Sequence, residues 1–263
     1  MINDFLISFS LKNTYRVNGI LYSIKQIPII GKLLPSSLYG VSGLKVLANV
    51  ISAIWELISI FAGKLIYLAI MFFGAQMIFE NAKIAQDGIF LHSLFFLTII
   101  GALMNTYMFN PTNDKYYAMI LMRMDAKKYT LTNYGYAILK VIVGFFPFVI
   151  IFGRLMSIPL WLCIIIPFFI AGMKLTVASI YLIMYEKSGK VVNENGPGAV
   201  TWIFIVLLFA AAYGLPAIGL VIPTIAFVIA AAVCILAGIL SCAKIVRFSR
   251  YKEMYHKILV NAK

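Results

Sequence analysis

The fold class of this chain is decided by the stretch NGPGAVTWIFIVLLFAAAYGLPAIGLVIPTIAFVIAAAVCILAGILSCA, residues 195–243. These 49 residues contain no Asp, Glu, Lys, Arg or His. A helix needs about 20 apolar residues to cross a bilayer. The stretch therefore has room for two crossings joined by a short return, which Gly214, Pro216, Gly219 and Pro223 mark. It predicts a polytopic membrane protein.

The composition supports a helical membrane protein and excludes a soluble domain. Of the 263 residues 63% are hydrophobic and 12% are charged, and the mean hydropathy is +0.97. A soluble fold of this length would need a polar surface that this composition does not provide. Long apolar runs without alternation also argue against a β-barrel, whereas helices satisfy their own backbone groups in lipid. We therefore expect an all-α protein.

Four further apolar stretches bring the expected number of spanning helices to six. They lie at about 46–79, 88–109, 129–153 and 155–185. Apolar and basic residues are interleaved through residues 1–45, which suits an amphipathic segment at the headgroup level, broken by Pro28 and Pro35. The expected organisation is this interfacial segment, a transmembrane domain at 46–246 and a basic tail at 247–263.

The distribution of Lys and Arg predicts the orientation. Residues 1–45, the 113–128 segment, the 186–198 loop and the tail from Lys244 hold 17 of these residues, whereas the opposite turns hold two. Basic residues collect on the cytoplasmic side of helical membrane proteins. Both termini are therefore expected in the cytoplasm, and the net charge of +13 is attributed to the membrane surface and not to nucleic acid.

No motif for a self-contained catalytic site is present in the sequence. The two histidines, His92 and His256, belong to no HExxH pattern, and there is no GxSxG elbow, Walker A motif or paired carboxylate within a span. The three cysteines show no metal-binding spacing. We expect a non-catalytic subunit with no metal or cofactor of its own.

Charges inside apolar stretches are the candidates for a pathway, because each is costly to insert into lipid. Glu56 and Lys64 lie eight residues apart and so fall near one helix face, and Tyr67 follows them. The alternative for Glu56 is a position at the wet boundary of its helix. For Lys174 the choice is between the pathway and an ordinary boundary position.

Small residues at every fourth position predict a close helix contact on the last span. These are Ala230, Cys234, Gly238 and Cys242. Small side chains on one stripe let a second helix approach closely. The alternative is a chance pattern in an alanine-rich helix.

The segment NDKYYAMILMRMDAKK at 113–128 predicts a short cytoplasmic helix that binds a partner. Exposed Tyr116, Met119 and Met122 would form the docking surface, since aromatic and Met side chains are favoured at interfaces. Basic residues, among them Lys115 and Arg123, would steer an acidic partner. The full candidate set is Asp114, Lys115, Tyr116, Met119, Ile120, Met122 and Arg123. The alternative is a helix resting on lipid.

Two stretches carry a resemblance to a known family: NTYRVNGILYSIKQIPIIGKLLPSSLYG at 13–40 and MRMDAKKYTLTNYGYAILK at 122–140. With the six spans, they resemble ABC-2-type exporter permeases, and among these the Pmt-type exporters of amphipathic toxin peptides, the phenol-soluble modulins. The resemblance implies a bacterial cytoplasmic membrane location, a second permease copy or paralogue, and two copies of a separate ABC ATPase that binds ATP and Mg. It also implies that the helix around 114–124 is the coupling helix, that residues 1–45 form the elbow-like interface helix, and that the turn at 214–223 is the outer re-entrant feature.

The sequence therefore predicts the permease subunit of an ATP-driven ABC exporter, which moves amphipathic or hydrophobic peptides outward by alternating access. Two alternatives from other classes stay open. One is an intramembrane enzyme that acts on lipid or peptide, and the other is a membrane assembly factor without transport.

Overall fold

A computed structural model describes residues 2–27, 42–79, 85–192, 194, 196 and 198–261. Within these ranges the chain is helical and contains no strand. Pro28 and Pro35, named above, lie outside the described part, as do the basic residues Lys32 and Lys83.

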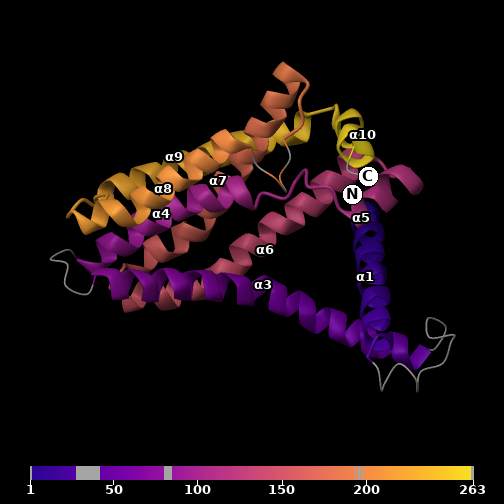
Figure 1. The fold of residues 1–263 in the computed structure, drawn as a ribbon, viewed down its shortest axis with the longest axis horizontal. Helices are drawn as coiled ribbons and strands as arrows, with labels where there is room; N and C mark the ends of the chain where they lie inside the picture. Colours follow the sequence, from indigo (N-terminus) through magenta and orange to yellow (C-terminus); the bar gives the residue numbers. More distant parts are fainter. Residues whose placement is uncertain are drawn as a thin grey trace.

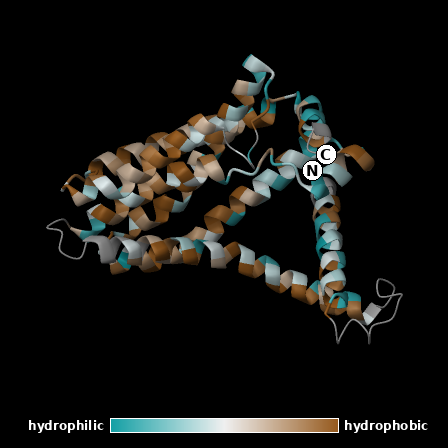
Figure 2. Ribbon diagram, viewed as in Figure 1, coloured by the Kyte–Doolittle hydropathy of each residue, from teal (hydrophilic) through white to brown (hydrophobic). Residues whose placement is uncertain are grey.

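Six helices are long and apolar enough to cross a membrane, as the sequence predicts, and they mark a multi-pass membrane protein. They are α3 (Ser42–Phe79), α4 (Gln86–Met104), α6 (Ala126–Leu155), α7 (Leu160–Ser188), α8 (Ala199–Ala217) and α9 (Thr224–Arg247). Figure 1 shows them as an elongated bundle with α3 along one side. Hydrophobic residues predominate along the bundle helices in Figure 2.

The remaining helices gather at one end of this bundle. They are α1 (Ile2–Lys25), α5 (Asn113–Tyr116), the π-helical turn η2 (Tyr117–Leu121) and α10 (Tyr251–Asn261). In Figure 1, α1 runs across the direction of the bundle helices, and both chain ends lie beside α5 and α10. The bundle end with α1, α5 and α10 is called the terminal end below.

A close helix contact in the bundle joins α7 to α9, where two glycines face each other. A Cβ atom on Gly238 would lie 2.5 Å from the Cα of Gly172, and one on Gly172 would lie 2.7 Å from the carbonyl oxygen of Cys234. Such a contact requires glycine on both sides, because even a methyl group would push one backbone away from the other.

The stripe of α9 that is turned inward differs from the every-fourth pattern expected for this helix. Cys234 and Gly238 lie at the α7 contact, but Cys242 is exposed and Ala230 is only half-buried. The inward stripe consists of Phe227, Ala231, Cys234, Gly238, Ser241 and Ile245. Its spacing alternates between four and three residues, as in helices that pack nearly parallel.

Two apolar cores hold the fold. In the bundle core, the rings of Phe95 and Phe169 stack with centroids 6.0 Å apart, and Phe227 meets Phe169 edge-on at 5.5 Å. At the terminal end, α10 buries Tyr251 and Tyr255 in a second core with residues of α6 and α7. This second core fixes α10 against the segment that precedes α5.

Candidate functional site

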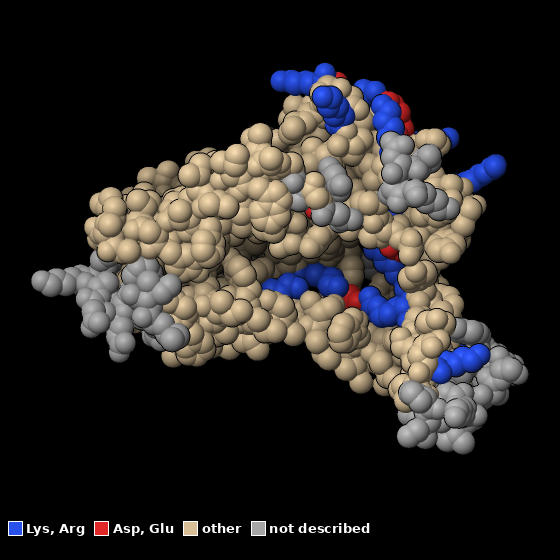
Figure 3. Space-filling model, viewed as in Figure 1, with Lys and Arg blue, Asp and Glu red and all other residues tan. Residues whose placement is uncertain are grey.

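A cavity of about 660 Å³ opens among α1, α3, α4, α6 and α7. All three residues that the sequence proposed for a pathway, Glu56, Lys64 and Tyr67, line it. Its lining includes five basic side chains and one carboxylate: Lys12, Arg16, Lys64, Lys140, Lys174 and Glu56. Figure 3 shows Lys and Arg atoms gathered in the hollow between α3 and the rest of the molecule.

The carboxylate of Glu56 joins three helices. It accepts from the Arg16 guanidinium of α1 at 2.7 Å and from the Lys140 ammonium of α6 at 2.7 Å. The Tyr136 hydroxyl donates to the same carboxylate at 3.0 Å. Since the Glu56 side chain is only 14% exposed, these partners replace most of the water that its charge needs. Glu56 is therefore neither an isolated charge in lipid nor a solvated boundary residue.

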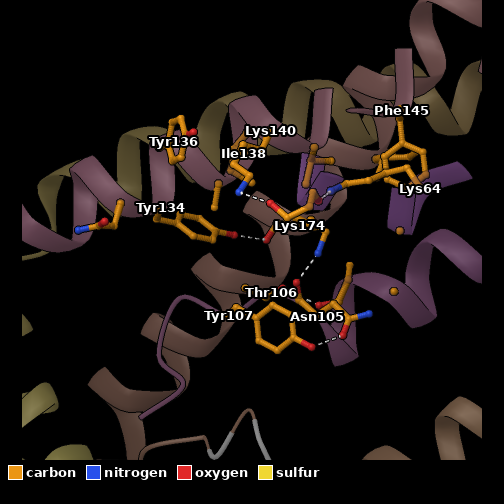
Figure 4. Close-up of a pocket in the computed structure, with 18 of the residues that line it drawn as sticks. Lys64, Asn105, Thr106, Tyr107, Tyr134, Tyr136, Ile138, Lys140, Phe145 and Lys174 are labelled. Carbon is orange, nitrogen blue, oxygen red and sulfur yellow. Dashed lines mark hydrogen bonds between the residues drawn. The ribbon is translucent and has the colours of Figure 1, made fainter. Parts of the chain in front are cut away.

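Lys64 and Lys174 reach the cavity from α3 and α7. The Lys64 ammonium donates to the Ser59 carbonyl at 3.0 Å, and the Lys174 ammonium donates to the Asn105 carbonyl. Within the described part of the chain, no carboxylate lies at ion-pair distance from either lysine. Figure 4 shows Lys64, Lys140 and Lys174 approaching the same space from three helices. Neither lysine therefore has a direct ion-pair partner among the described residues, although Glu56 and Glu194 lie near enough to attract them.

Helix α1 forms one wall of the cavity through polar contacts. Asn13 donates to the Asn49 side chain at 2.7 Å and accepts from the Ser52 hydroxyl at 2.8 Å. On α6, Asn133 donates to the Ser8 hydroxyl at 2.6 Å. These contacts attach α1 to both α3 and α6, so a displacement of α1 would change the shape of the cavity.

Another part of the lining is apolar and aromatic. The ring of Tyr67 meets that of Phe145 edge-on, with centroids 5.9 Å apart. Leu97, Val141 and Ile170 continue this surface. The cavity thus combines a cationic wall with an apolar wall, which suits a molecule that carries both kinds of group.

The 113–128 segment differs from its expected form in length and in exposed face. The helical part ends at Leu121, and α6 begins at Ala126 after an Asp125 cap that accepts from the Lys128 N–H at 2.7 Å. Tyr116, Met119 and Ile120 pack against the core at the terminal end and are half-buried. The exposed side chains are Tyr117, Leu121, Met122 and Arg123. The prediction that Tyr116 and Met119 are exposed was wrong, and the one for Met122 is confirmed.

Lys115 is buried, so it cannot steer a partner as the sequence suggested. Its ammonium donates to the carbonyls of Met108 and Asn110, both at 3.0 Å, and to the Asn110 side chain at 2.7 Å. Burial lowers the pKa of Lys115 to about 8, although the nearby Glu194 carboxylate acts in the opposite direction. Lys115 therefore ties the start of α5 to the segment before it.

Glu194 completes this arrangement from the loop after α7. One carboxylate oxygen accepts from the backbone N–H groups of Phe109 and Asn110 at 2.8 and 2.9 Å. Burial raises the pKa of Glu194, against the lowering effects of these N–H bonds and of Lys115. Lys115 and Glu194 thus both bind the backbone of residues 108–110, and these contacts hold the loop after α7 and the start of α5 to one segment.

Asp114 points from α5 toward α1 and α6. Its carboxylate accepts from the Tyr129 hydroxyl at 3.1 Å and lies 3.8 Å from the Lys12 ammonium. Although burial acts to raise it, Lys12 and the Tyr129 bond hold the pKa of Asp114 below its ordinary value. Asp114 thus connects the candidate docking segment to a residue that lines the cavity.

The other candidate groups have structural roles in this fold. His92 faces the Ala211 carbonyl at 3.0 Å and accepts from the Ile222 N–H at 3.0 Å, so it fixes the α8–α9 turn to α4. The described residues contain no group of three or more His, Cys, Asp or Glu side chains that could hold a metal ion.

Sequence reasoning missed the partners that define the cavity. Arg16, Lys140 and Tyr136 were not singled out as partners of Glu56. The spacing of Tyr136 and Lys140, one turn apart on α6, is a signal that both face the same side. Comparisons with family models, with curated proteins and with solved structures found no match for this chain. The cavity and the terminal end of the bundle are therefore the features that point to a function.

Proposed function

We propose that this chain is the permease subunit of an ATP-driven ABC exporter in the bacterial cytoplasmic membrane, with both termini inside. The observation that carries the proposal is a direct connection between the exposed segment at 113–123 and the cavity. An exporter whose motor is a separate subunit needs such a connection, because the force of ATP hydrolysis must reach the cargo path from outside the bundle.

The connection runs through α1. The Tyr15 hydroxyl accepts from the Asn113 side chain at 3.1 Å, and its ring lies 6.2 Å from that of Tyr117. One turn earlier on α1, Lys12 pairs with Asp114 and lines the cavity. A push on η2 would therefore move α1, and α1 is a wall of the cavity. Alternating access requires a coupling of this kind.

The docking surface of the proposal is the exposed set Tyr117, Leu121, Met122 and Arg123. An aromatic ring, two apolar side chains and one cation match the composition of interface cores. The chain carries no nucleotide motif, so ATP and Mg would be bound by two copies of the partner ATPase. A second permease copy or a paralogue would complete the path.

The cargo class follows from the two walls of the cavity. Tyr67 and Phe145 offer an apolar surface, while Lys64 and Lys174 offer positive charge. An amphipathic peptide presents both an apolar face and polar groups, including its C-terminal carboxylate. We propose amphipathic peptides as the cargo, entering from the inner leaflet.

Transport is tested in inverted membrane vesicles that contain this chain with or without a co-expressed candidate ATPase. The ATPase is chosen as the product of a neighbouring reading frame that carries GxxxxGK[ST]. The proposal expects ATP-dependent uptake of a labelled amphipathic peptide only when both subunits are present. Uptake that is absent with both subunits would favour an assembly factor, and modification of lipid or peptide by the chain alone would favour an intramembrane enzyme.

Docking is tested by exchanging the exposed apolar residues Leu121 and Met122 for glutamate. Because these side chains point away from the fold, the variant should insert normally but lose at least about tenfold in capture of the ATPase, the effect of burying unpaired charge in an interface. The matched control is Ile218→Glu, an exposed residue in the α8–α9 turn at the opposite end of the bundle. Unchanged capture by the Leu121→Glu, Met122→Glu variant would remove η2 as the docking site.

A further inference from the structure

The cavity contains more positive charge than its own carboxylate can balance. Glu56 is already shared between Arg16 and Lys140, each at 2.7 Å. Lys64 and Lys174 remain, and both line this cavity without a carboxylate at ion-pair distance among the described residues. A lysine ammonium has three donors, and each of these two makes one hydrogen bond to a backbone carbonyl. Such a pair in partly apolar surroundings is costly unless an anion joins it.

The position of the cavity favours an anion that comes from the bilayer. One wall is α3, whose apolar side chains, such as Trp55, Ile58 and Ile66, are exposed along its length. The cavity therefore borders the region that lipid chains would fill. Its apolar wall at Tyr67 and Phe145 continues from the charged one, so one molecule can contact both. The cytoplasmic leaflet, where the basic end of this chain is expected, is rich in anionic lipids.

We propose that this cavity is a binding site for an anionic phospholipid, with the phosphate of the headgroup between Lys64 and Lys174 and an acyl chain along Tyr67 and Phe145. The phosphate oxygens would accept charge-assisted hydrogen bonds from both ammonium groups, which are the strongest hydrogen bonds available to such a head. Lys140 stands beside them but is engaged by Glu56 and by the Ser59 hydroxyl at 3.3 Å. The inference goes beyond the proposed function, because lipid binding requires neither an ATPase nor a cargo. A cargo peptide that used the same walls would displace the lipid, so the two would occupy the cavity in turn.

The test measures binding to the purified full chain in a neutral detergent by titration calorimetry. The probes are dihexanoyl phosphatidylglycerol, dihexanoyl phosphatidylcholine and inorganic phosphate. The anionic lipid is expected to bind about tenfold or more tightly than the zwitterionic one, and high salt should weaken it. Phosphate alone should bind weakly, since it lacks the acyl contact. Tight phosphate binding that displaces the lipid would identify a site for the free anion instead, and equal binding of both lipids would overturn the proposal.

Variants assign the binding to this cavity. Lys64→Gln combined with Lys174→Gln should weaken binding of the anionic lipid about tenfold or more, because both charge-assisted bonds are lost. Lys187→Gln, an exposed lysine at the end of α7, is the matched control and should bind as the native chain does. Lys64→Arg combined with Lys174→Arg keeps both charges and should retain binding. If the variant with Lys64→Gln and Lys174→Gln does not fold, the relative affinity of the native chain for the two lipids decides whether the proposal holds. The lipid would bind outside this cavity if the folded double Gln variant kept its affinity for the anionic lipid, or if Lys187→Gln lost as much affinity as the double variant.

Discussion

At the scale of single residues, Glu56 controls how three helices meet. Its sequence position allowed either a pathway residue or a boundary residue, and its true neighbours lie far away in the chain, with Lys140 at a separation of 84 residues. An acidic residue in an apolar stretch predicts that a partner exists. It does not predict which of the basic residues supplies the partner, because this depends on how α1 and α6 are placed against α3.

Replacing Glu56 by glutamine should loosen α1 from the bundle. The change leaves Arg16 and Lys140 without their shared carboxylate in a site where Glu56 is only 14% exposed. Removing one partner from a largely buried charge cluster costs about 2–4 kcal/mol. We expect a lower thermal midpoint in detergent and faster amide hydrogen exchange in α1, measured by mass spectrometry.

The control is Glu253→Gln on α10, where the carboxylate pairs with Arg250 and Lys257 but is exposed. Solvent screens such pairs, so neither the thermal midpoint nor the exchange of α1 should change. If Glu56→Gln behaves like this control, the carboxylate does not hold α1.

At the same scale, Lys115 shows that a charged residue type does not by itself predict an exposed side chain. The sequence placed it among basic residues that would meet a partner, whereas it is buried beside Glu194 and donates to backbone carbonyls. The two residues belong to different connections of the bundle. Both bind the backbone of residues 108–110, and no local pattern in the sequence encodes this shared contact.

At the scale of elements, the six apolar helices were predictable because uncharged stretches of sufficient length have few other solutions. Which face each element turns inward was less predictable. Four residues of an α-helix advance by about 400°, so a strict every-fourth stripe drifts by about 40° at each step. This drift turns Cys242 out of the contact that Gly238 makes with α7.

The η2 turn presents a related difficulty. Its residues are apolar on every side, so the pattern did not decide which face is exposed, and Tyr116 and Met119 were expected to be exposed. Contacts with the core at the terminal end turn Tyr116, Met119 and Ile120 inward. Amphipathic patterns assign a face only where polar residues occupy the other one.

Replacing Gly238 by alanine should separate α7 from α9. The added methyl group would lie 2.5 Å from the Cα of Gly172, and because that neighbour is backbone, one helix must move. Overpacking of this kind costs about 1–3 kcal/mol. The expected result is a lower thermal midpoint of the purified chain. Gly214→Ala in α8 is the matched control, since nothing lies within 4 Å of its new methyl group, and it should be neutral or slightly stabilising. Equal thermal midpoints for the two variants would show that the contact between Gly172 and Gly238 does not determine the stability of the fold.

At the scale of the whole molecule, the cavity depends on a helix that lies outside the bundle. Most residues of the cationic wall come from the bundle helices, but Lys12 and Arg16 come from α1, which also contacts α5 through Asp114 and Tyr15. The helices at the terminal end and the cavity therefore form one connected unit. A cytoplasmic partner can contact this unit only if α5 and both chain ends lie on the cytoplasmic side of the membrane.

That arrangement is tested by cysteine accessibility in a variant whose three native cysteines are replaced by alanine. Single cysteines are introduced at the exposed positions Asn18 on α1, Lys252 on α10 and Ile218 in the α8–α9 turn. Since an even number of crossings returns the chain to its starting side, an impermeant maleimide should label Ile218→Cys in intact cells and label the other two only after the membrane is opened. Labelling of Asn18→Cys and Lys252→Cys from opposite sides of the membrane would contradict six crossings. It would also contradict the proposal that the docking surface and the cavity open toward the same compartment.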